Sequence, residues 1–186
     1  MGNIIRFDGG YVESPLQMTP TFTDIDLDQD YDFFTCTQSG NVIFYENLES
    51  SIDNIPIYEY KSSFWQDISI VGTPDLNRHG AASIAFIDID LDGDLDLSWG
   101  DFFQNSLYII YNLGTPENPI MDNQNIVTNF PENYNLYTAG QNMPNFSDID
   151  LDGDLDLFIT VLSGAFGNQY KNNFFYFENI YDIENY

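Results

Sequence analysis

Apolar and polar residues alternate with a period of two over short stretches of the chain, and turn residues separate these stretches. This alternation is typical of β-strands that bury one face. The stretches fall into three groups that repeat in the same order: residues 19–23, 32–36 and 41–47, then 81–87, 96–100 and 106–112, then 143–147, 156–161 and 172–179. No stretch shows a helical period with capping residues, so the pattern predicts an all-β protein.

Two further stretches, 56–65 and 125–130, predict a fourth strand for the first and second groups. Four antiparallel strands in a repeat of this length describe one blade of a β-propeller. We therefore expect a single propeller-type region over 1–186, with blades at approximately 19–80, 81–142 and 143–186. The last blade is incomplete, and residues 1–10 supply an orphan strand that completes a blade.

Three blades are too few to close a ring, because propellers typically have about four to eight. Two alternatives stay open at this point. Chains associate, for example two chains that together provide six blades, or the sequence is part of a longer propeller.

An acidic loop lies between the first two strands of every unit. The sequence DIDLDGDLDL occupies 88–97 and 148–157, and the related DIDLDQDYDF occupies 24–33. Aspartates stand at positions 1, 3, 5, 7 and 9 of each loop: Asp24, Asp26, Asp28, Asp30 and Asp32; Asp88, Asp90, Asp92, Asp94 and Asp96; Asp148, Asp150, Asp152, Asp154 and Asp156. Intervals of 64 and 60 residues between the loops indicate a shared role rather than chance acidity of the surface.

Alternate aspartates in a tight turn converge their carboxylates on one point, where they suit a hard cation. Ca²⁺ takes about six to eight oxygen ligands. Zn²⁺ is disfavoured because the candidate ligands are all oxygens, and Mg²⁺ because it prefers to retain water. Mn²⁺ stays open. We expect up to three Ca²⁺, with position 7 offering its backbone carbonyl.

The loops begin like an EF-hand but do not continue as one. An EF-hand requires a bidentate Glu at position 12, where this chain has Thr35, Trp99 and Ile159. Glycine at position 6 permits a sharp turn in the second and third loops, whereas the first loop has Gln29 there. The first site is therefore predicted to be the weakest.

The pattern Asp-x-Asp-x-Asp-Gly-x-x-Asp, together with the aromatic strand that follows it, resembles the FG-GAP/VCBS repeats of integrin-α-type β-propellers. The match is complete in the second and third loops, has Gln for Gly in the first, and the resemblance extends from about Thr19 to Asn179. It implies structural Ca²⁺ at one rim of a propeller, held by the carboxylates at positions 1, 3, 5 and 9 and by the main-chain oxygen of position 7. It also implies recognition or adhesion outside the cell, toward a protein or a glycan.

Thirty acidic and four basic residues give a formal net charge of −26, which excludes a nucleic-acid partner because phosphate binding requires clustered Lys and Arg. No run approaches the roughly 18 apolar residues of a membrane span, so membrane insertion is not expected. Cys36 is the only cysteine, which excludes an internal disulfide and predicts a buried, inert thiol. The first residues lack a signal-peptide pattern, and we expect any secretion signal to lie outside this sequence.

A non-catalytic recognition module, extracellular or at the cell surface, is the function that these features favour. The alternatives are a passive, calcium-stabilised assembly module of a larger secreted protein and, less favoured, a polysaccharide-degrading enzyme. His79 beside Arg78 is a thin basis for general-base catalysis, because the remaining candidate groups serve as metal ligands. Packing between blades is the alternative role for the aromatic residues that could stack on sugars. These candidates are Trp65, Trp99, Phe102, Phe103 and Phe166.

Overall fold

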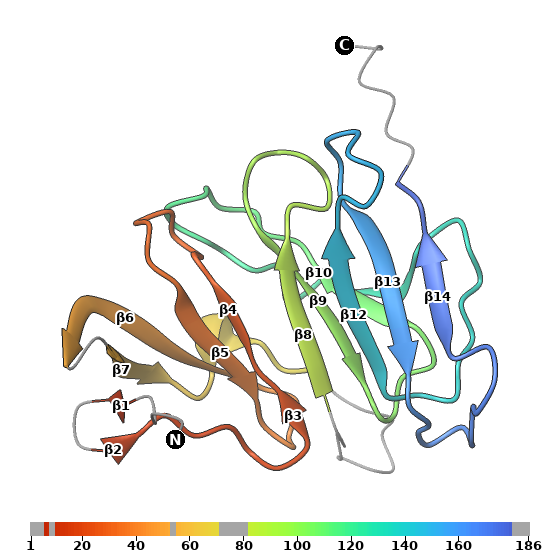
Figure 1. Ribbon diagram of the computed structural model, residues 1–186, viewed down its shortest axis with the longest axis horizontal. Helices are drawn as coiled ribbons and strands as arrows, with labels where there is room; N and C mark the ends of the chain where they lie inside the picture. Colours follow the sequence, from red (N-terminus) through yellow and green to blue (C-terminus); the bar gives the residue numbers. More distant parts are fainter. Residues whose placement is uncertain (1–5, 8–9, 53–54, 71–81, 180–186) are drawn as a thin grey trace.

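The computed structural model describes residues 6–7, 10–52, 55–70 and 82–179. They form the strands β1 to β14 and one short 3-10 helix, η1 (Trp65–Asp67). The strands make three separate sheets, and none of them closes on itself (Figure 1). The prediction of an all-β protein is confirmed. Within the described ranges, no helix is long and apolar enough to cross a membrane.

The first sheet contains the strands predicted for the first unit. Its antiparallel strands, in order, are β4 (Thr21–Thr23), β5 (Asp32–Cys36), β6 (Val42–Ile52) and β7 (Ile55–Ser62). β1 (Arg6–Phe7) lies parallel to β7, and β2 (Gly10–Tyr11) pairs with β1 at the outer edge. The described part of the N-terminal stretch thus adds to the first sheet of its own chain.

The second sheet contains the four strands predicted for the second unit and one unexpected strand. The antiparallel strands are β8 (Ala82–Ile87), β9 (Asp96–Asp101), β10 (Leu107–Ile110) and β11 (Val127–Phe130). β3 (Met18–Thr19) pairs parallel with β8. The sequence predicted one strand over 19–23, but it divides at Pro20, which has no backbone N–H to donate to a ladder.

The third sheet has three antiparallel strands: β12 (Asn142–Ser147), β13 (Asp156–Val161) and β14 (Phe174–Phe177). No fourth strand follows β14 in the described residues, which end at 179. Residues 71–81, which include Arg78 and His79, also lie outside the described ranges.

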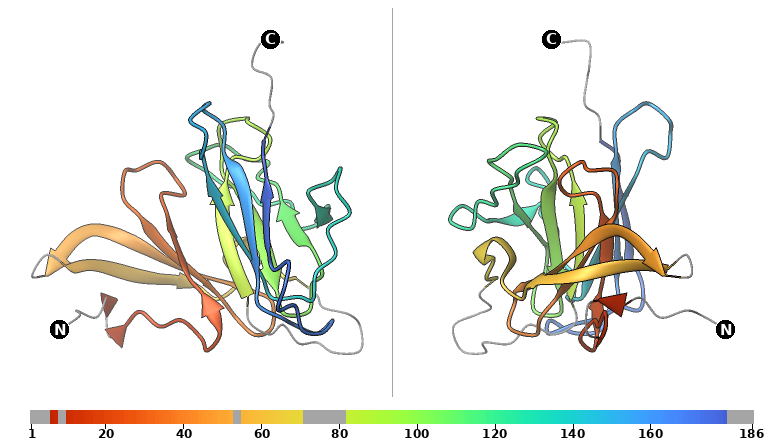
Figure 2. Two further views of the ribbon diagram at one scale, coloured as in Figure 1. Left: turned by 45° about the vertical axis from the view of Figure 1, so that its right-hand side comes forward. Right: turned by 90° about the vertical axis from the view of Figure 1, so that its left-hand side faces the viewer.

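Two apolar clusters join neighbouring sheets and place the second sheet between the other two (Figure 2). Phe34, Trp65 and Trp99 belong to the cluster between the first and second sheets. Leu107 and Ile159 belong to the cluster between the second and third. Burial alternates along edge strands such as β14, as the period-two pattern predicts, whereas β5 and β9 in the middle of their sheets are buried at every residue. The two clusters also hold together the ends of the three sheets, where the acidic loops lie.

Candidate metal centres

The three acidic loops lie at the same end of the molecule, at the top of the view in Figure 1. Each connects the first two strands of its unit: β4 to β5, β8 to β9, and β12 to β13. An antiparallel ladder therefore holds both ends of every loop. Each hairpin brings five aspartates, the first and last of them eight residues apart, into a single turn.

The backbone follows the same path in all three loops. The φ angles at position 4 are 58°, 63° and 65°, for Leu27, Leu91 and Leu151. Those at position 6 are 78°, 98° and 103°, for Gln29, Gly93 and Gly153. Left-handed conformations at alternate positions tighten the chain, and each costs a non-glycine residue roughly 1–2 kcal/mol. Three loops keep this strained path, so a compensating interaction is required at each of them.

The carboxylate at position 1 holds the turn with one oxygen. The Oδ2 atom accepts a hydrogen bond from the backbone N–H of position 6, at 3.1 Å in the first loop, 3.0 Å in the second and 3.2 Å in the third. The Oδ1 atoms of Asp24, Asp88 and Asp148 are buried and have no hydrogen-bond partner. A buried carboxylate oxygen without a partner is costly. A cation beside it would remove that cost in all three loops.

Position 5 closes a second, smaller turn. Its Oδ1 accepts from the backbone N–H of position 7 at 3.1 Å in every loop: Asp30 to Asp28, Asp94 to Asp92, and Asp154 to Asp152. These contacts fix the middle of the loop without using the second carboxylate oxygen of position 5. The side chains of Asp94 and Asp154 are buried, whereas that of Asp30 is half-buried.

The aspartate at position 9 is buried in all three loops and is bonded to the third strand of its unit or to the residue two positions after that strand. Its Oδ1 accepts from the backbone N–H of a recurring asparagine, at 2.8 Å for Asn47, 2.8 Å for Asn112 and 3.0 Å for Asn179. In the second and third loops its Oδ2 also accepts from position 2, at 2.9 Å from Ile89 and 3.3 Å from Ile149. The recurrence of these asparagines in the sequence therefore marks a contact of the loop with its sheet.

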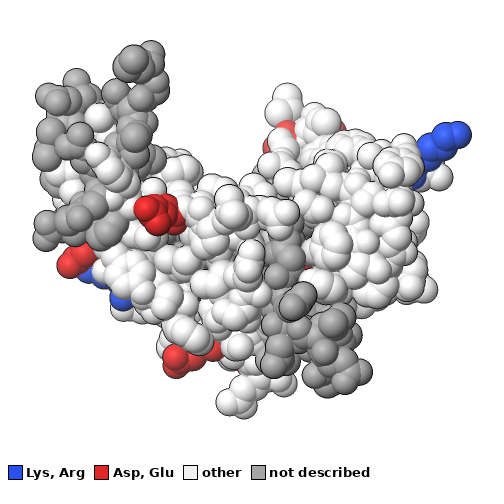
Figure 3. All heavy atoms as spheres, turned by 90° about the horizontal axis from the view of Figure 1, so that it is seen from below, with Lys and Arg blue, Asp and Glu red and all other residues white. Residues whose placement is uncertain are grey.

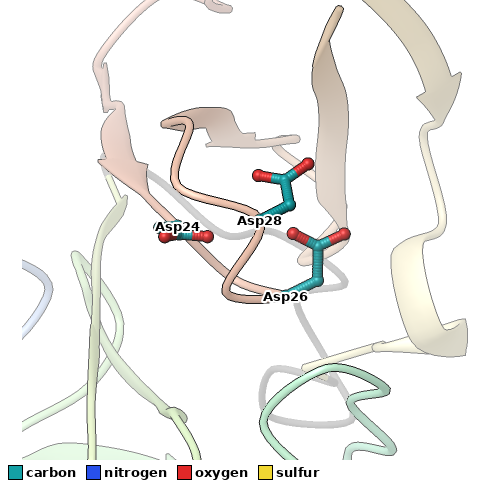
Figure 4. A group of neighbouring side chains, drawn as sticks. All are labelled: Asp24, Asp26 and Asp28. Atoms are coloured by element: carbon teal, nitrogen blue, oxygen red, sulfur yellow. The ribbon is translucent and has the colours of Figure 1, made fainter. Parts of the chain in front are cut away.

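Carboxylate oxygens gather at one point in each loop. The groups whose oxygens lie within 4.8 Å of one another are Asp24, Asp26 and Asp28; Asp88, Asp90 and Asp96; and Asp148, Asp150 and Asp152. In the first loop, the three side chains project from a single turn (Figure 4). Positions 1 and 3 take part in every group. Of the predicted ninth-position ligands, Asp96 joins its group, whereas Asp32 and Asp156 remain outside theirs.

The arrangement is electrostatically unfavourable for the protein alone. Burial raises the pKa of Asp32 to about 7, assisted by the charges of Asp26, Asp30 and Asp28 and opposed by the hydrogen bond from Asn47. Burial likewise raises the pKa of Asp96 to about 6, and burial together with the charge of Asp92 raises that of Asp94 to about 6. A raised pKa is what burial and neighbouring negative charges produce in carboxylates that have no cation beside them.

The basic side chains described in the structure that form ion pairs do so away from the loops. The two ion pairs found among the described side chains join Lys61 to Glu46 and to Glu59, and neither acid belongs to a loop. With 30 acids and only four bases in the chain, basic side chains are too few to neutralise three such clusters. The donor set is entirely oxygen, which matches the preference of hard divalent cations. Each cluster could hold one metal ion.

A groove of about 600 Å³ lies beside the second and third loops, between the second and third sheets. Asp88 and Asp154 line it, as do the apolar side chains of Tyr111, Phe130 and Phe177. The first aspartate of the second loop can therefore be reached from solvent through this groove. An entry path of this kind is one requirement for a metal site that loads from solution.

The aromatic candidates divide by burial. Trp65 and Trp99 are buried at 7% and 0% exposure and belong to the core between the first and second sheets. Phe102 and Phe103 are half-buried, and Phe166 is 47% exposed. The predictions for His79 and Arg78 fall on residues outside the described ranges.

The sequence did not reveal the left-handed leucines at position 4, because leucine carries no local preference for that conformation.

Comparison with models of known protein families, with curated proteins and with solved structures gives no match for this chain.

Proposed function

We propose that the chain is a non-catalytic, calcium-binding repeat module whose three metal ions brace one end of its sheets. The observation that carries the proposal is the buried Oδ1 of Asp24, Asp88 and Asp148, each without a hydrogen-bond partner in an identically folded turn. Ca²⁺ accepts several carboxylates in flexible geometry, and extracellular modules bind it at about 10⁻⁴–10⁻³ M. An exterior rich in calcium suits such sites, and we place the protein outside the cell or at its surface.

In this proposal the three sheets are propeller blades of the FG-GAP/VCBS type, and the module serves recognition or adhesion of a protein or a glycan. Support comes from the repeated order of strand, acidic loop, strand and aromatic strand. The metal ions themselves would do no chemistry on a substrate. They would bind loop carboxylates and remove six units of the formal charge of −26, leaving −20. The carboxylates are then committed to the metal, which disfavours their use as an acid–base pair.

Calorimetric titration of the metal-free protein with Ca²⁺ tests the proposal. We expect about three bound ions per chain, with binding abolished loop by loop on replacing the position 1 aspartate by asparagine. Mg²⁺ in place of Ca²⁺ is the control, and its binding should be much weaker. Absence of heat and of any thermal shift at millimolar Ca²⁺ would refute the metal sites, whatever the protein recognises.

A second candidate function, assembly, is favoured by the outer face of the third sheet. Phe158 stacks on Phe174 and on Tyr176, with ring centroids 5.9 Å and 5.1 Å apart, and Phe174 is 61% exposed. Phe158 pairs with Tyr176 as Phe34 pairs with Phe44 in the first sheet, where the stacked rings are covered by the core toward the second sheet.

The third sheet therefore exposes the kind of face that the first sheet buries against its successor. We propose that a further unit covers it, supplied by a second chain so that two chains provide six units, or by a longer protein. Measurement of the mass in solution separates these alternatives. A dimer that Phe174→Lys converts to a monomer supports the second chain, and a monomer at every accessible concentration excludes it.

A further inference from the structure

At the end of the molecule opposite the acidic loops, the described connections of the second and third sheets carry little charge. Three segments of these sheets lie there: residues 101–106 between β9 and β10, 137–141 before β12, and 162–170 after β13. Asp101 is the only charged residue in these segments, and Lys171 directly follows the last of them. Asp101 is fully buried, and its carboxylate accepts hydrogen bonds from Trp99 Nε1 at 3.1 Å and from the Phe103 N–H at 2.7 Å. Figure 3 views the molecule from this end, where small groups of acidic and basic side chains stand apart among the uncharged described atoms.

Three exposed aromatic side chains lie on these segments. Tyr137 is 68% exposed and Phe166 is 47% exposed, and their ring centroids lie 6.3 Å apart at an interplanar angle of 53°. Tyr170 is 81% exposed on the same segment as Phe166. Because the tyrosine and the phenylalanine come from different segments, their proximity is a product of the fold and not of the local sequence. We call Tyr137, Phe166 and Tyr170 the aromatic platform.

Backbone hydrogen bonds fix the segments that carry the platform. The N–H of Phe166 donates to the carbonyl oxygen of Ala139 at 3.0 Å, and the N–H of Ala165 donates to that of Phe102 at 2.9 Å. The N–H of Ala139 in turn donates to Gln169 Oε1 at 2.8 Å. Tyr137 and Phe166 thus lie on two segments that are hydrogen-bonded to each other, and these bonds fix the relative position of the two rings.

Two glycines allow these chains to approach so closely. A Cβ at Gly140, where φ is +98°, would lie 2.4 Å from the carbonyl oxygen of Phe102. A Cβ at Gly164 would lie 2.5 Å from the same oxygen. Neither position tolerates a side chain without movement of backbone. A surface built on such packing is ordered before any ligand arrives, which lowers the entropic cost of binding.

We propose that the aromatic platform binds neutral carbohydrate, and this rests on the recognition function proposed above. Aromatic rings present a negative face, against which the C–H groups on one side of a sugar ring pack favourably. Exposed Asn168 and half-buried Gln141, on the same segments as the platform, carry amide groups that can donate to and accept from hydroxyl groups. These are the components of a site that fixes a small polar ligand on an apolar surface.

The distribution of charge favours a neutral ligand over charged ones. A polyanion would be repelled by a chain of net charge −26. A basic partner would be drawn to the opposite end, where the loop carboxylates are concentrated. An uncharged sugar is neither repelled by the net charge nor attracted to the loop carboxylates, and its hydroxyl groups need no counter-charge.

Titration of the calcium-loaded chain with neutral oligosaccharides derived from cellulose, mannan, galactan and chitin, followed by amide NMR shifts and calorimetry, tests this site. We expect binding to at least one series, with shifts in residues 137–141 and 162–170. Tyr137→Ala and Phe166→Ala should each weaken binding by roughly tenfold. Tyr31→Ala removes a tyrosine that is 65% exposed within the first acidic loop, at the opposite end of the molecule, and it should leave sugar affinity unchanged.

The calcium isotherm of each variant separates this proposal from the metal sites. Tyr137→Ala and Phe166→Ala should retain normal Ca²⁺ binding and melting temperature, so that loss of sugar binding is not loss of folding. Failure of a calcium-loaded, folded chain to bind any of the four series at millimolar concentration would overturn the platform and leave the metal sites standing. Equal sugar affinity in the wild type and both platform variants would overturn it too, as would a change from dimer to monomer in those variants without sugar binding in the wild type.

Discussion

The first and second acidic loops fold alike although their sequences differ at the position where glycine matters most. Gln29 has a φ of 78° and Gly93 a φ of 98°, and both donate their N–H to the position 1 carboxylate at nearly equal distances. The carboxylate groups nonetheless differ. The first loop gathers positions 1, 3 and 5, whereas the second gathers positions 1, 3 and 9.

The comparison shows that glycine does not create this turn. Hydrogen bonds from backbone N–H groups to aspartate side chains, together with the two strands that hold the loop ends, impose the same path on glutamine. Glycine lowers the strain of that path. The two loops should therefore bind the same ion in the same place but with different affinities, and the first should be the weaker.

Removal of all metal should produce the largest effect, because it acts on every loop at once. A ligand at about 100 times its Kd contributes roughly 2.7 kcal/mol per site to the free energy of unfolding. We expect excess EDTA to lower the melting temperature substantially, as measured by calorimetry at matched ionic strength. Restoration by Ca²⁺ and not by equal Mg²⁺ is the control. A melting temperature indifferent to EDTA would contradict structural metal in either loop.

Replacement of the first aspartate should separate the two loops. Asp88→Asn keeps an oxygen that can accept the hydrogen bond from Gly93 but removes a negative ligand. We expect loss of one calcium site, and a fall of roughly 2–3 kcal/mol in stability at saturating Ca²⁺. Asp24→Asn should cost less, because the site it removes is weaker. Glu117→Gln, an exposed acid outside the loops, should change neither quantity. Equal losses in the two aspartate variants would argue against unequal sites.

In the absence of metal, the first and second loops should make different contributions to the pH dependence of the free energy of unfolding. The pKa of Asp32 is raised from 3.8 to about 7, so between these values the folded chain keeps a proton that the unfolded chain has released. Stability in EDTA should therefore fall as pH rises from about 4 to about 7. The raised pKa of Asp96, about 6, gives the same sign and ends at lower pH.

Urea unfolding at a series of pH values in EDTA measures this effect. Asp32→Asn should flatten the part of the curve near pH 7, and Asp96→Asn the part near pH 6. In excess Ca²⁺ stability should instead rise with pH, because protons compete with the ion for the carboxylates. A urea midpoint that climbs steadily with pH in EDTA would be inconsistent with protonated, buried carboxylates in the empty loops.

The loops also mark how far the sequence alone could lead. Strands and hairpins could be predicted because the period-two pattern and the turn residues are local signals. The convergence of positions 1 and 3 could be predicted for the same reason. That Asp96 joins its group while Asp156 does not could not be predicted, because the second and third loops have the same ten residues. The pairing of β3 with β8 could not be foreseen either, because it joins residues distant in the chain.

Exchange of the residues at position 6 should have the smallest effect and tests the comparison most directly. Nothing lies within 4 Å of a Cβ built at Gly93, so Gly93→Gln adds backbone strain without a steric clash. We expect it to weaken calcium binding at the second loop by about 1 kcal/mol, which is roughly fivefold in affinity.

The reverse change, Gln29→Gly, relieves strain in the first loop and should tighten its site by about 0.5–1 kcal/mol. Gly93→Asn provides the control, because asparagine accepts the left-handed conformation more readily than glutamine and should lose less. Calorimetric titration of the single and double variants gives the affinities. If the double variant keeps the wild-type order, with the first loop still the weaker, position 6 does not set the difference. The composition of the carboxylate groups, with Asp28 in one and Asp96 in the other, would then be its origin.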